Sequence, residues 1–140
     1  MNIFMTTLRD GTYKGFKTTW TLAKVIVPIY IIITILKYTP VIGWIAILFE
    51  PLMQLFGLPG EAAIALVMGN LLNLYAGIGV MVTLPLSVKQ LTIMAVMLSF
   101  SHSLLVETAV SKRVGVSVPM ILTVRLGLMI LSGVLMNLMY

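Results

Sequence analysis

The feature that most constrains this chain is its longest apolar run, VIVPIYIIITIL, which fills positions 25–36 without a charged residue. With its flanks the run forms an apolar segment over 18–38. At the rise of an α-helix this segment reaches about 31 Å, enough to cross the hydrocarbon core of a bilayer. Lys24 and Lys37 flank the run, and their side chains can extend to the two opposite membrane–water interfaces. The segment predicts a transmembrane helix that Pro28 kinks mildly.

The rest of the composition extends this prediction to the whole chain. Hydrophobic residues make up 60% of the 140 positions and charged residues 9%, and the mean hydropathy is +1.11. Soluble domains carry roughly 25% charged residues. We therefore expect an all-α integral membrane protein with about five helical segments, some of them broken or re-entrant. The predicted segments are 18–38, 41–56, 62–84, 90–110 and 116–139.

The N-terminal segment over 1–24 mixes cations with aromatic residues, which is typical of an amphipathic helix at a membrane interface. A cleaved signal peptide is the alternative, but no small-residue cleavage site follows a compact apolar core. We expect this segment to precede a single membrane domain over 25–140. The net charge of +5 indicates contact with anionic lipid headgroups, because the cations lie beside the apolar segments; we expect no binding of nucleic acid. The cations and aromatics are Arg9, Lys14, Lys17, Lys24, Phe4, Tyr13, Phe16 and Trp20.

The segment 41–56 is apolar but short, and Glu50-Pro51 interrupts it. A residue that precedes proline is disfavoured in the helical region of backbone space. The pattern predicts a broken, re-entrant or interfacial helix here, with a continuous crossing as the alternative.

Polar residues gather in an apolar setting over 57–79. Glu61 follows a Gly-Leu-Pro-Gly turn, so its carboxylate could complement the dipole of the next helix or contact a ligand. Asn70 and Asn73 are three residues apart, and on one helix they would share a face. Their amides could bond a neighbouring helix or bind a ligand.

A second polar stretch covers 99–113. Ser101, His102 and Ser103 precede an apolar helix that contains Glu107. The four-residue spacing of Ser103 and Glu107 would place both on one helical face, with the imidazole to the side. A histidine at this depth could simply be hydrogen-bonded, or it could bind a ligand or a proton.

Arg125 lies within the last apolar segment and requires a carboxylate partner at that depth. The available glutamates are Glu50, Glu61 and Glu107, and we expect a structural ion pair with Glu107.

Catalytic and metal-binding signatures are absent from the sequence. It contains no GxSxG, HExxH, P-loop or dinucleotide-binding motif, no cysteine and a single histidine. Adjacent residues on a helix point apart, so Ser101 and His102 are poorly placed for a catalytic triad. We expect no enzyme, no cofactor and no metal site.

Two stretches, GLPGEAAIALVMGNLLNLYAG and SHSLLVETAVSKRVG, resemble the nucleoside-recognition or Gate domain of spore maturation proteins A and B. The resemblance covers about 40–115. Ferrous-iron permeases are similar in the pattern Gly69-Asn70-Leu71-Leu72-Asn73, but they carry cysteine where this chain has Leu72. Concentrative nucleoside transporters are longer and carry two related halves. The resemblance implies one repeat unit of a transporter-like fold.

Sites in repeat-built transporters form between two units, from the ends of broken helices. We therefore expect a transport-related protein that binds a small polar solute, nucleoside-like or ionic, and that works as a homodimer or as a heterodimer with a related Gate-domain chain. The alternative is a structural or assembly protein of the spore maturation type. The larger number of cations on the N-terminal side predicts that the N-terminus lies in the cytoplasm. We expect the chain to lie in the cell membrane. The candidate ligand-binding residues are Glu61, Asn70, Asn73, Ser101, His102, Ser103 and Glu107.

Overall fold

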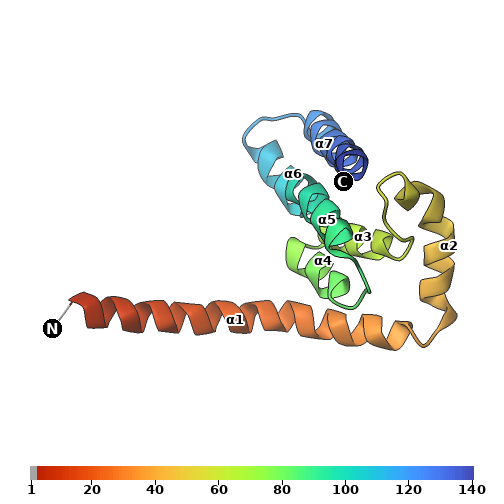
Figure 1. Cartoon of the computed structure of the whole chain (residues 1–140). Coiled ribbons are helices and arrows are strands. Elements are labelled where there is room, and N and C mark those ends of the chain that lie inside the picture. Colours follow the sequence, from red (N-terminus) through yellow and green to blue (C-terminus); the bar gives the residue numbers. More distant parts are fainter. Residues whose placement is uncertain (1–2) are drawn as a thin grey trace.

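The computed structural model describes residues 3–140, and this part of the chain forms seven helices joined by short turns, with no strands (Figure 1). The predicted all-α class is confirmed. Three stretches are long and apolar enough to cross a membrane: Ile3–Leu36, Val88–Lys112 and Val118–Met139. The helices are α1 (Ile3–Leu36), α2 (Pro40–Gln54), α3 (Ala62–Leu71), α4 (Leu74–Met81), α5 (Val88–Ser101), α6 (Leu104–Arg113) and α7 (Val118–Met139).

Helix α1 is one continuous helix of 34 residues, about 51 Å long, and it is not interrupted at position 24. Its C-terminal part packs against α4, where Gly79 leaves room for Ile29. Its N-terminal part projects away from the other helices (Figure 1). The expected interfacial location of this part stays a prediction, and positions 1–2 lie outside the described residues.

Helix α2 corrects the expected break at Glu50-Pro51, because it continues through Pro51 to Gln54. The turn that follows Pro51 is held by Met53 and Phe56, both buried in the core. Tertiary packing therefore overrides the local preference of the residue before proline. With 15 residues, about 22 Å, α2 is still shorter than the hydrocarbon core.

The predicted single helix over 62–84 is wrong, because the chain breaks between α3 and α4. Asn73 has an extended backbone, with φ −167°, and its side-chain oxygen accepts a hydrogen bond from the Ala76 N–H at 3.0 Å. An N-cap of this kind starts a new helix. Asn70 and Asn73 therefore do not share one helical face.

The predicted span over 90–110 corresponds to the candidate membrane span Val88–Lys112, but within it His102 and Ser103 separate α5 from α6. Ser103 has φ +54°, in the left-handed region that L-residues rarely adopt. The spacing of Ser103 and Glu107 is therefore that of an N-cap and a first-turn residue, and not of two positions within one helix.

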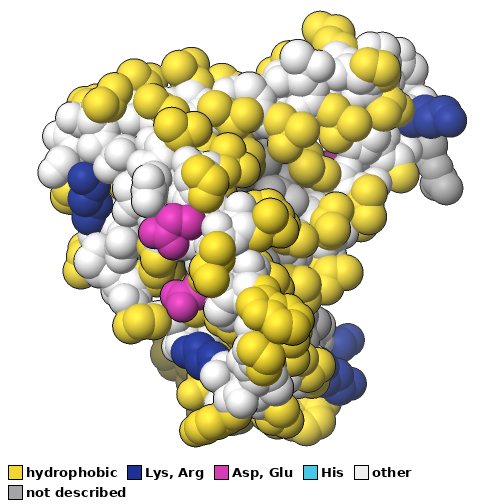
Figure 2. Space-filling model, turned by 90° about the vertical axis from the view of Figure 1, so that its right-hand side faces the viewer, with side chains coloured by type: hydrophobic (Ala, Val, Ile, Leu, Met, Phe, Trp, Pro, Cys, Tyr) yellow, Lys and Arg dark blue, Asp and Glu magenta, His cyan; other side chains and the backbone are white. Residues whose placement is uncertain are grey.

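Helices α3, α4, α5 and α7 surround the core. Helix α7 packs along α5, and Gly133 of α7 leaves space for Met97 and Phe56. On the face shown in Figure 2 hydrophobic side chains predominate and charged ones are scattered, as expected of a surface in contact with lipid. The largest fully buried side chains are Ile93, Met94, Met97, Leu98, Val80 and Ser101.

Candidate functional site

The two helix breaks meet in space. The backbone N–H of Ser103, at the start of α6, donates to the carbonyl oxygen of Gly69 in the last turn of α3 at 2.9 Å. We call this region the junction; it comprises the chain around both breaks together with Glu107 and Arg125. Helix ends within a membrane protein leave backbone groups without helical partners, so they persist where protein or polar contents satisfy them.

Arg125 of α7 closes the end of α5. Its Nε donates to the carbonyl oxygen of Phe100 at 2.7 Å, and its Nη2 donates to that of His102 at 3.0 Å. Its Nη1 pairs with Oε2 of Glu107. A cation at a helix C-terminus is favourable because the last carbonyls lack helical donors and carry partial negative charge. Arg125 therefore joins three helices through one guanidinium group.

Glu107 lies in the first turn of α6, where a carboxylate also complements the helix dipole. Its second oxygen, Oε1, lies 3.3 Å from Nδ1 of His102. The angle at this contact falls outside the range of a hydrogen bond, and Nδ1 counts as buried and unpartnered. Glu107 thus lies between the guanidinium group of Arg125 and the imidazole of His102.

Three buried side-chain atoms of the described residues lack a hydrogen-bond partner: Oδ1 of Asn70, Nδ1 of His102 and Oγ1 of Thr108. The amide nitrogen of Asn70 has only a weak acceptor, Sδ of Met129 at 3.8 Å. An unpartnered buried polar group costs about 1 to 3 kcal/mol. All three residues lie at or next to the junction, and Thr108 is the one that sequence reasoning missed, although it directly follows Glu107.

The other predicted site residues have different surroundings. Ser101 is fully buried and donates to the carbonyl oxygen of Met97 in its own helix at 3.0 Å. The side chain of Asn73 caps α4. Ser103 is half-buried, and its side chain makes no capping bond.

Glu61 does not join the junction. It precedes α3 at the opposite end from Gly69, about 12 Å away along the helix, and it lines a separate hollow with Lys37.

Two cavities border the junction. A cavity of about 290 Å³ lies between α6 and α7, and the ion pair of Glu107 and Arg125 forms part of its wall together with Ser111. A second cavity of about 200 Å³ lies between α2, α3 and α7, and Asn70 is its polar lining residue among Phe49, Phe56 and other apolar side chains. Among residues 3–140 no group of three histidine or acidic side chains is placed to hold a metal ion.

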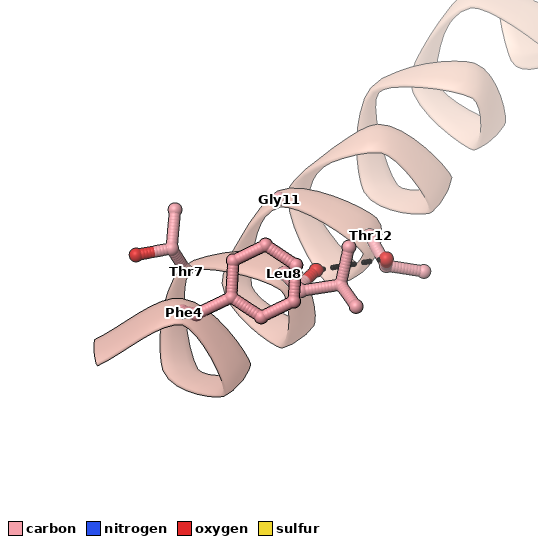
Figure 3. Close-up of a pocket in the computed structure, with 5 residues that line it drawn as sticks. All are labelled: Phe4, Thr7, Leu8, Gly11 and Thr12. Atoms are coloured by element: carbon pink, nitrogen blue, oxygen red, sulfur yellow. Dashed lines mark hydrogen bonds between the residues drawn. The ribbon is translucent and has the colours of Figure 1, made fainter. Parts of the chain in front are cut away.

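A hollow on the N-terminal part of α1 is a different kind of feature. Figure 3 shows that Phe4, Thr7, Leu8, Gly11 and Thr12 all come from one helix, and the Thr12 hydroxyl bonds the Leu8 carbonyl of the same helix. No second element closes this hollow among the described residues, so we do not count it as a site.

The Gate family, described as nucleoside recognition, matches residues 19–117. The chain is 53% identical over 130 residues to the uncharacterized membrane protein YvoD of Bacillus subtilis. The matched region makes up 93% of this chain and 42% of YvoD. The chain is 38% identical over 76 residues to the inner membrane protein YjiG of Escherichia coli, which covers 54% of this chain and 49% of YjiG. The chain thus spans less than half the length of the curated relatives it matches. No solved structure matches.

Proposed function

Because this chain belongs to the Gate family of nucleoside-recognition membrane proteins, we propose that it is transport-related and that its junction binds a small polar solute. The observation that carries the proposal is the meeting of two broken helices around unpartnered polar atoms. Transporters that are built from repeats form their sites from helix ends of this kind.

The chemistry of the junction limits the solute. Oδ1 of Asn70 is an acceptor, so a partner there has to donate a hydrogen bond or be a cation. The ion pair of Glu107 and Arg125 presents both charges to the α6–α7 cavity. A nucleoside-like molecule that carries N–H and O–H groups, or a small ion, fits these requirements.

We further propose that a second Gate-like unit completes the site, as a homodimer or as a heterodimer with a related chain. The support is the exposed share of the junction: 42% of the Glu107 side chain and 30% of the His102 side chain are exposed. A polar face of this kind is costly in lipid unless protein or water covers it.

Solute binding to the purified chain in lipid nanodiscs tests the proposal, with uridine, adenosine and Mn²⁺ as probes. We expect one of these probes to bind, and Asn70→Leu to weaken its binding at least tenfold, about 1.4 kcal/mol. Gln54→Leu, on the exposed face of α2, is the matched control and should leave binding unchanged. Equal loss in both variants, or no binding of any probe, contradicts the proposal.

The second candidate function is structural, an assembly role without transport. It is favoured by the internal use of Ser101, Asn73 and Arg125, whose polar groups all bond within the chain. Cross-linking and mass measurement in lipid separate the two functions. Substitutions at the junction that abolish assembly without any measurable solute site would support the structural role.

A further inference from the structure

The contact between His102 and Glu107 is unusual in its chemistry. An ionised carboxylate oxygen only accepts hydrogen bonds, and a ring nitrogen without a proton also only accepts. At 3.3 Å, Oε1 and Nδ1 would then face each other as two acceptors in a partly desolvated place. A proton between them converts this repulsion into attraction, after a small rotation of either side chain to align the bond.

Among the helices around His102, only one acidic side chain, that of Glu107, faces the imidazole. Helix α7 contributes Arg125, which already engages the other carboxylate oxygen and the His102 carbonyl. Helix α3, which also packs against α6, contains no charged residue. The cations Lys112 and Arg113 lie at the far end of α6 from the break. Glu107 is therefore the negatively charged group that faces the imidazole.

We propose that His102 and Glu107 form a proton-binding site of the junction, in which Nδ1 of His102 carries the proton toward Oε1 of Glu107. Both side chains are partly exposed, at 30% and 42%, but Nδ1 itself is buried, so the proton that it carries is shielded from solvent. The site is made by the helix break: Ser103 turns the chain so that the imidazole at the end of α5 faces the first turn of α6.

The site gives the junction a means of coupling. Glu107 holds Arg125 through one oxygen and the proton site through the other, so a solute that engages Glu107 changes both contacts. Solute binding at Glu107 should then change the tautomer of the His102 ring. This last step rests on the proposed solute site, whereas the proton site itself does not.

The chain contains one histidine, which makes the test direct. The full chain, labelled with ¹⁵N-histidine and purified without a histidine tag, is reconstituted in nanodiscs and its imidazole nitrogens are recorded by NMR from about pH 5 to 8. We expect Nδ1 to be protonated throughout, in the neutral and in the charged ring. Glu107→Leu, which removes the acceptor for Nδ1–H, should change the ring tautomer, whereas Glu61→Leu, which alters a distant acid, should not.

A wild-type spectrum with bare Nδ1 in the neutral ring overturns the proposal without any variant. Identical nitrogen shifts in the wild type and in Glu107→Leu overturn it as well. Neither reading requires a bound solute, so failure of the solute proposal and failure of this one are separate results.

Discussion

At the scale of single residues, Arg125 organises the junction. One guanidinium group satisfies two carbonyls at the end of α5 and a carboxylate at the start of α6. The side chain is only 16% exposed, so its partners would be left in a poorly solvated place if it were removed. Removal of Arg125 therefore destabilises the protein by leaving its partners unpaired, and not only by removing a charge.

Arg125→Ala should lower the free energy of unfolding by about 2 to 3 kcal/mol, because it removes hydrogen bonds that involve a charged group. Glu107→Ala in the same chain should recover part of that loss, since it removes the carboxylate left unpaired. Thermal or denaturant unfolding in detergent measures both.

The control for this cycle is Glu61→Ala combined with Arg125→Ala. Glu61 lies at the other end of α3, so its effect should add to that of Arg125 within about 0.5 kcal/mol. If the effects of Arg125→Ala and Glu107→Ala on the free energy of unfolding also add, the ion pair does not contribute to stability.

At the scale of helices, the close crossing of α3 and α4 depends on glycine. A Cβ atom at Gly77 would lie 3.0 Å from the backbone of both Ala65 and Gly69. Contacts that short with backbone atoms force the two helices apart. The crossing holds the α3–α4 break, and with it Asn70, in place.

Gly77→Ala should therefore destabilise the protein by about 1 to 3 kcal/mol through overpacking, although alanine is the better helix former. Gly127→Ala in α7 is the control, because no atom lies within 4 Å of its added Cβ. It should stabilise by up to about 1 kcal/mol. A Gly77→Ala protein as stable as the wild type would contradict the close crossing.

The sequence predicted the helical segments better than their interruptions. Apolar runs identified the membrane-spanning segments, because helix length follows from bilayer thickness. The break at Ser103 includes a tertiary hydrogen bond to Gly69, which the sequence does not show. Asn73 caps α4 through a local bond to Ala76, and asparagine before an apolar run is an N-cap signal that could have predicted this break. At Pro51 the sequence predicted a break that the structure does not have, since packing around Met53 keeps α2 continuous.

The site residues divide in the same way. Arg125 required a carboxylate, and its pairing could be expected from charge alone. The proximity of His102 to Glu107 could not, because it arises from the left-handed backbone of Ser103. Glu61 was grouped with the others only because it is polar and nearby in sequence.

At the scale of the whole molecule, the distribution of cations predicts orientation. Four cations, Arg9, Lys14, Lys17 and Lys24, lie in the N-terminal two-thirds of α1, whereas Lys37 follows its C-terminal end. Positively charged loops remain in the cytoplasm. We expect a reporter that is active only in the cytoplasm to be active when fused to the N-terminus.

The same fusion at the C-terminus reports on α2. If α3 and α4 together cross the membrane once, a crossing α2 places the two termini on opposite sides, whereas a re-entrant α2 places both in the cytoplasm. A silent N-terminal fusion contradicts the orientation.

The short helices also set an order for biogenesis. Helices α2, α3 and α4 have 15, 10 and 8 residues, and none reaches the about 20 that a translocation channel needs to release a helix into lipid by itself. Helix α1 precedes them, is long enough, and offers Ile29 as the surface against which α4 docks. We therefore expect these three short helices to enter the bilayer together, after α1 and packed against it.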